Sequence, residues 1–302
     1  MKFCPPIQKL QRRIGLFLLA SLSFVTSSRQ AQAHHSTGHG ASESVRILNA
    51  FGTDLKPRQR LALIEEVAKG TAEPDLNVAT GYSTSALLQT HLLKGIYLSY
   101  QLPLLFIDQL DPNPLLVGLG DSRLGLQWNP GTDNNSSGSP WTLLFNLGIP
   151  TRTYKLATDP GRQWLLTGGM NYSRNFRNLS FYTLLLGSYE FRPAGGALDI
   201  SPGFGIGASL TKRLQLNAGM NLDIRAINTC KLPNGSEFCP NGRPSESERE
   251  VGATRAYGTL ALSYELNRDW TIFGSGQLPF TAKRDIEWGA NLGVEWRFDW
   301  KL

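Results

Sequence analysis

Apolar and polar residues alternate along most of the chain after residue 75. The clearest stretch runs from Arg213 to Arg225, where every second residue is apolar: Leu214, Leu216, Ala218, Met220, Leu222 and Ile224. Alternation with a period of two predicts a β-strand with one apolar side and one polar side. Thirteen residues is also longer than a typical strand of a soluble protein, which has about 5–6 residues.

The same period recurs in eleven segments, and no helical period is evident among them. They span residues 75–82, 96–102, 121–129, 141–149, 164–172, 181–191, 198–210, 213–225, 254–266, 269–280 and 286–300. The connections are rich in Gly, Pro, Asn and Asp, which favour turns. We therefore predict an all-β fold, a transmembrane antiparallel β-barrel of about 12 strands. Because eleven is an odd number, we expect one further strand, and place it in region 104–118.

Two features favour a barrel in lipid over a soluble sheet. Tryptophan and tyrosine stand near the ends of the apolar faces, where membrane barrels carry aromatic girdles. Charged residues stand within the opposite faces, which predicts a polar lumen enclosed by a lipid-facing surface. The predicted lumen-lining residues are Asp121, Arg123, Gln127, Asn217, Asn221, Asp223, Arg225, Glu265, Glu295 and Arg297. Either they bias what enters the lumen, or they pair internally and fill it. Their two signs nearly balance, so strong ion selectivity is not expected.

The first 33 residues have the three parts of a secretory signal peptide. A basic start ends at Arg12-Arg13, an apolar stretch covers 14–25, and a small-x-small site stands at Ala31-Gln32-Ala33. The chain has 302 residues and a formal net charge of +6, but this segment holds five of the 30 basic residues and no acidic one. The remainder has 25 basic and 24 acidic residues and no basic run, which argues against a nucleic-acid partner.

Residues 34–74 are predicted to form a leader that carries histidines and one short periplasmic helix. The helix is expected over 54–70, where Asp54 can cap it and Leu61, Ile64 and Ala68 share one face. Residues 75–302 would then form the barrel.

The histidines His34, His35 and His39 are the best chemical lead. With cleavage after Ala33, a free amine and imidazoles could chelate Cu, Zn or Ni weakly. The alternative is a flexible polar leader whose histidines are incidental. No other cofactor is expected.

Cys230 and Cys239 lie nine residues apart in a Pro/Gly/Asn/Ser-rich stretch. In an exported chain they are expected to form a local disulfide that staples a loop. No Gly-x-Ser-x-Gly elbow and no phosphate-binding loop is present, so we do not expect an enzyme.

Several motifs resemble one family. Residues 118–126 (GLGDSRLGL) are similar to its Gly-x-Gly-Asp strand, and 269–280 with 293–298 (GVEWRF) resemble its closing hairpin. The family is that of outer-membrane transporters of the phenol-degradation meta-pathway type. The last strand also resembles the C-terminal signal that the barrel-insertion machinery recognises in bacterial outer-membrane proteins.

The resemblance implies an outer-membrane barrel that passes or binds small, hydrophobic or aromatic solutes through its lumen. One alternative is a barrel with a closed lumen and a structural or adhesive role, and another is a metal-associated envelope protein. A soluble exported β-sandwich is a further alternative. The sequence leaves the oligomeric state open.

Overall fold

The structure is a computed structural model that describes residues 59–70, 80–108, 116–130, 140–151, 153, 164–192, 195–228, 251–252, 254–281 and 286–298. The predicted signal peptide, His34, His35, His39, Cys230 and Cys239 lie outside these residues. Within the described residues, no helix is both long and apolar enough to cross a membrane.

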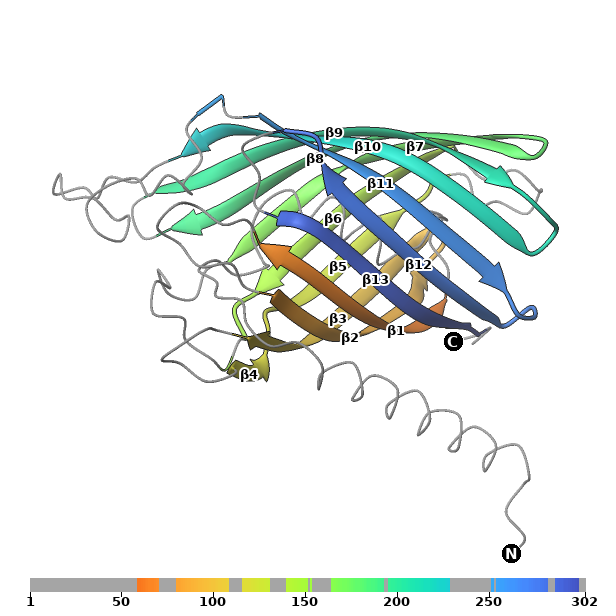
Figure 1. Cartoon of the computed structure of the whole chain (residues 1–302), viewed down its shortest axis with the longest axis horizontal. Coiled ribbons are helices and arrows are strands. Elements are labelled where there is room, and N and C mark those ends of the chain that lie inside the picture. Colours follow the sequence, from red (N-terminus) through yellow and green to blue (C-terminus); the bar gives the residue numbers. More distant parts are fainter. Residues whose placement is uncertain are drawn as a thin grey trace, which may run out of the picture. The chain divides into compact units, whose positions relative to one another are not determined.

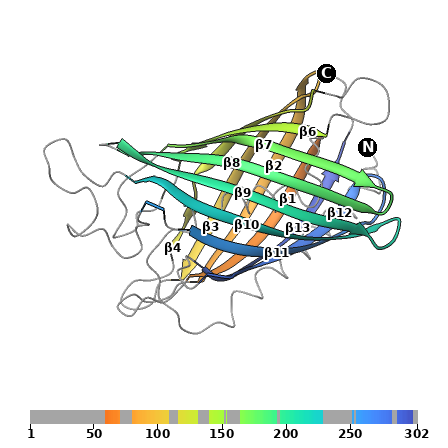
Figure 2. The ribbon, with the colours of Figure 1, turned by 90° about the horizontal axis from the view of Figure 1, so that it is seen from above.

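Thirteen strands form one antiparallel sheet that closes on itself (Figures 1 and 2). They are β1 (Arg60–Gly70), β2 (Thr80–Leu93), β3 (Ile96–Asp108), β4 (Leu116–Leu119), β5 (Ser122–Trp128), β6 (Trp141–Ile149), β7 (Leu165–Phe176), β8 (Leu179–Arg192), β9 (Gly195–Ser209), β10 (Leu214–Asn228), β11 (Thr254–Glu265), β12 (Trp270–Pro279) and β13 (Ile286–Arg297). β1 pairs with β2 on one side and with β13 on the other, which closes the ring. Figure 1 shows β1, in orange, directly beside β13, in blue.

The thirteen strands occupy twelve positions around the barrel. β4 pairs with the far half of β3 (residues 104–107), and β5 pairs with its near half (residues 96–101). β4 and β5 therefore act as one strand interrupted at Gly120 and Asp121. The predicted all-β barrel of about 12 antiparallel strands is confirmed. In region 104–118, where we expected a further strand, the described residues belong to the end of β3 and to β4, and β4 adds no position to the ring because it continues the line of β5.

The strand that the sequence analysis missed is β1, and the predicted helix over 54–70 is wrong for residues 60–70. Leu61, Ile64 and Ala68 do have helical spacing, but Leu61 faces outward at 44% exposure whereas Ile64 and Ala68 are buried inside. Both faces of this segment are largely apolar, so its local pattern fits either structure. Closure of the barrel favours the strand over the helix. In lipid every backbone amide and carbonyl needs a hydrogen-bond partner, and β1 supplies the partners for the facing edges of β13 and β2. The first described strand of the barrel accordingly begins at Arg60, whereas the barrel was expected from residue 75.

The two faces of the strands have inverted polarity compared with a soluble protein. On β8 and β9 the exposed side chains are apolar, such as Leu185 (43%), Phe204 (54%) and Ile206 (61%). On β10 the buried side chains include Asn221 and Asp223, each 1% exposed. An apolar outer surface around a largely polar interior is the arrangement expected of a barrel that spans a bilayer.

The two ends of the barrel differ in their connections. At one end, which we call the short-turn end, β1 begins, β13 ends, and four of the five connections are no longer than four residues: 94–95, 177–178, 210–213 and 266–269; the fifth is 129–140. At the other, the long-loop end, the connections are 71–79, 109–115, 150–164, 193–194, 229–253 and 280–285.

Candidate functional site

The interior of the barrel carries a cluster of buried apolar side chains. Its members are Ala62 and Ile64 of β1, Leu87 of β2, Leu144 of β6, Leu184 and Leu186 of β8, and Phe273 of β12. All seven are at most 5% exposed and form one buried cluster, against which Tyr182 of β8 packs. We call this cluster the apolar band. It makes this part of the interior apolar and low in dielectric constant, unlike the polar interior typical of water-filled porins.

Glycines opposite large side chains shape this part of the interior. The ring of Tyr182 lies where a side chain of Gly205 on β9 would stand, and its hydroxyl lies against Gly219 on β10. That hydroxyl is hydrogen-bonded to Thr259 on β11. Phe273 lies over Gly293 of β13 in the same way. The missing side chains let both aromatic rings lie flat along the wall.

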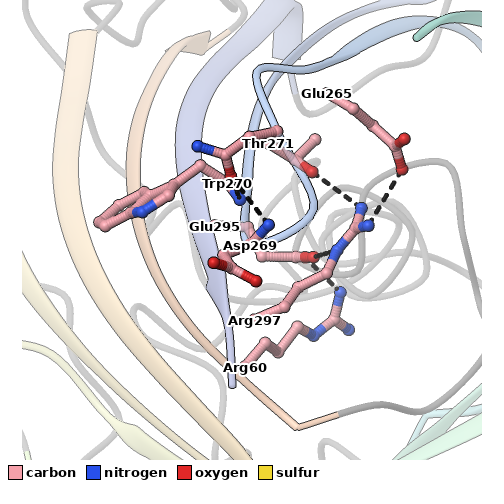
Figure 3. A network of polar contacts seen from close by, with 8 residues as sticks. Arg60, Glu265, Asp269, Trp270, Thr271, Glu295 and Arg297 are labelled. Atoms are coloured by element: carbon pink, nitrogen blue, oxygen red, sulfur yellow. Dashed lines mark hydrogen bonds and ion pairs between the residues drawn. The ribbon is translucent and has the colours of Figure 1, made fainter. Parts of the chain in front are cut away.

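An ionic network closes the seam of the barrel at the short-turn end (Figure 3). Arg60 donates through Nη1 to Glu295 at 2.9 Å, and Arg297 donates through Nε to the other oxygen of Glu295 at 2.8 Å. Arg297 also donates to Glu265 at 3.0 Å and to Thr271 at 2.8 Å. We call these five residues the seam network, because they join β1, β11, β12 and β13.

A second charged group lies inside the barrel toward the long-loop end. Arg225 of β10 pairs with Asp199 of β9 at 2.7 Å. Ser201 donates a hydrogen bond to Asp223 at 3.0 Å. The cross-strand partner of Asp223 on β11 is Arg255, which is also buried. The apolar band therefore lies between two layers of paired charges.

The ten predicted lumen-lining residues are all described, and five of them fall in the two charged groups. Glu265, Glu295 and Arg297 meet in the seam network, and Asp223 and Arg225 lie in the long-loop layer. Gln127 is buried and accepts a hydrogen bond from Gln89 at 2.9 Å. Asn217 and Asn221 are buried on β10. Arg123 of β5 and Asp121, just before β5, are half-buried.

Sequence reasoning missed the apolar band, Arg60 and Asp199. Strict alternation assigns only polar side chains to the interior, so Leu184 and Leu186 were not expected there. A signal does exist: the runs Leu143-Leu144-Phe145 and Leu184-Leu185-Leu186 break the alternation, which places apolar side chains on both faces. Arg60 was hidden by the predicted helix.

Comparison with known proteins supports the fold. No protein family and no curated protein sequence matches the chain. Among solved structures it is similar to an outer-membrane channel from Pseudomonas putida F1, with a TM-score of 0.60 and 10% identity over 81% of this chain and 97% of the channel. It is also similar to the translocator domain of the autotransporter NalP from Neisseria meningitidis, with a TM-score of 0.52 and 13% identity over 87% of this chain and all of that domain. This likeness extends to the fold, a closed antiparallel β-barrel, here with an apolar outer face.

Proposed function

We propose that this protein is an outer-membrane channel through whose lumen small hydrophobic or aromatic solutes pass or bind. The observation that carries the proposal is the apolar band, which lies inside the barrel between two layers of paired charges. A hydrated ion gains nothing from such a band, because it would have to shed water for contact with leucine and phenylalanine. A small apolar solute loses water at no such cost and gains burial.

The similar channel from Pseudomonas putida F1 supports this proposal at the level of fold. The sequence resemblance to transporters of the phenol-degradation meta-pathway type supports the finer proposal of an aromatic solute. The ten predicted lumen-lining residues belong to the proposal as polar groups of the path, with Glu265, Glu295, Arg297, Asp223 and Arg225 at its two ends. Short turns face the periplasm in outer-membrane barrels, so we assign the short-turn end to that side.

The proposal extends to the segments that the structure does not describe. A cleaved signal peptide over residues 1–33 would supply export, and the barrel-insertion machinery would place the chain in the membrane. Weak metal binding at His34, His35 and His39 and a disulfide between Cys230 and Cys239 stay predictions.

Uptake into vesicles with a lipopolysaccharide outer leaflet tests the proposal, because that leaflet slows apolar solutes. Vesicles holding the barrel should take up radiolabelled phenol several-fold faster than empty vesicles, with no such gain for glucose. Leu186→Gln, which puts an amide into the apolar band, should abolish the gain. Leu266→Gln makes the same chemical change at an exposed turn position and should preserve it. If vesicles that hold the folded barrel take up phenol no faster than empty vesicles, the proposal is refuted and a structural role is favoured.

A further inference from the structure

Two buried asparagines beside the apolar band have carboxamides that the described strands leave unsatisfied. Asn171 of β7 and Asn221 of β10 are each 1% exposed. Neither the Oδ1 nor the Nδ2 of either side chain has a hydrogen-bond partner in the described part of the chain. A buried amide without a partner costs about 1–3 kcal/mol, so each such group needs an explanation. A ligand that supplies the missing hydrogen bonds is one.

Leu184 and Gly203 lie between the two asparagines in one row of cross-strand partners. Asn171 is the cross-strand partner of Leu184, and Leu184 is in turn the partner of Gly203 on β9. Gly203 pairs with Asn221, whose Oδ1 lies where a side chain of Gly203 would stand. The carboxamide of Asn221 thus leans across β9 toward Leu184, while Asn171 borders Leu184 from β7.

Apolar groups complete the surroundings on the β7 side. The interior position next to Asn171 is Gly169, whose cross-strand partners are Leu144 and Leu186. A side chain at Gly169 would collide with Leu186, so Leu186 covers this position. Small-molecule sites are typically of this kind, with mostly apolar walls and a few polar groups that fix orientation.

We propose that Asn171, Leu184 and Asn221 form a solute subsite for small neutral molecules that combine an apolar ring or chain with one hydroxyl or carbonyl group. This inference rests on the proposed channel function and names its substrate class. A carboxamide both donates and accepts, so it suits a hydroxyl.

The charges nearby favour a neutral solute over an anion. Asp223 is the next interior residue of β10 after Asn221, is 1% exposed, and accepts a hydrogen bond from Ser201. Together with Asp199 it balances Arg225 and Arg255, so this group offers an anion no net positive charge to offset the water that the anion would lose.

Equilibrium binding of p-cresol and p-xylene by the full barrel in nanodiscs tests the proposal, because the two solutes differ by a hydroxyl in place of a methyl group. Titration calorimetry, with empty nanodiscs as background, should give about tenfold tighter binding of p-cresol to the unaltered protein, as one hydrogen bond provides. Asn171→Leu and Asn221→Leu should each reduce that preference to at most threefold. Asn217→Leu is the matched control, because it makes the same change two interior positions away on β10, and it should retain the preference.

The unaltered protein alone decides the question if a variant does not fold. Equal affinity for p-cresol and p-xylene would overturn the subsite, as would a preference that survives both leucine substitutions. Either result leaves the channel standing if phenol uptake exceeds that of empty vesicles. Binding of neither solute, together with no uptake of phenol, would instead overturn the channel function as well.

Discussion

Glu295 is the residue on which the seam network depends. Its side chain is 6% exposed, and its two oxygens bind Arg60, whose side chain is fully buried, and Arg297. Arg60 and Arg297 are cross-strand partners of β1 and β13. Two guanidinium groups therefore lie next to each other at the closing pair of strands, and like charges in that position are destabilising unless a carboxylate lies between them.

The substitution Glu295→Gln keeps the shape of this side chain and removes its charge. Breaking a buried ion pair by removing one partner costs about 3–5 kcal/mol. We expect a loss near the lower limit, about 3 kcal/mol, because Arg297 keeps its bonds to Glu265 and Thr271. Glu265→Gln is the matched control: the side chain of Glu265 is 36% exposed, so its loss should cost about 1 kcal/mol or less.

Urea unfolding of the barrel in phospholipid vesicles, followed by tryptophan fluorescence, measures both changes. The free energy of unfolding is extrapolated linearly to zero urea for each protein. A loss for Glu295→Gln within about 0.5 kcal/mol of that for Glu265→Gln would refute the argument, because burial would then not govern the strength of this network.

Two further predictions concern the wall and the outer surface. Gly205→Ala should destabilise the barrel by about 2 kcal/mol, because the new methyl group collides with the ring of Tyr182, while Gly187→Ala, with no atom closer than 3.9 Å, should have almost no effect in the same urea assay. Leu185→Arg puts a charge on the outer face in the middle of β8 and should lower the free energy of unfolding by about 3 kcal/mol. Leu210→Arg, in the turn after β9, should lower it by less than about 1 kcal/mol. Equal losses at both positions would contradict a lipid-facing β8.

The strands that alternate strictly could be predicted from sequence, and the rest could not for identifiable reasons. The strict alternation over residues 213–225 predicts the inner face of β10, although the strand itself continues to Asn228 beyond a shift in register after Arg225. β1 could not be found this way, since its apolar residues occupy both faces and only its pairing with β13 and β2 makes it a strand.

The site was accessible only in part. The sequence singles out the charges of β11 and β13, but the contact of Glu265 and Glu295 with Arg297 depends on strand register, which the alternation does not encode. The run Leu184-Leu185-Leu186 signals an apolar interior without saying which strands contribute to it. The unsatisfied amides of Asn171 and Asn221 become visible only when every neighbour is in place.

The pairing of β1 with β13 has a consequence for how the protein matures. The ring pairs β1, the first described strand, with β13, the last described one, so the barrel cannot close during folding until β13 is in place. Before that moment β1 and β12 each present a bare edge, which is a template for pairing with another molecule. Shortening the chain by its final strand would therefore produce a self-associating sheet instead of a smaller pore.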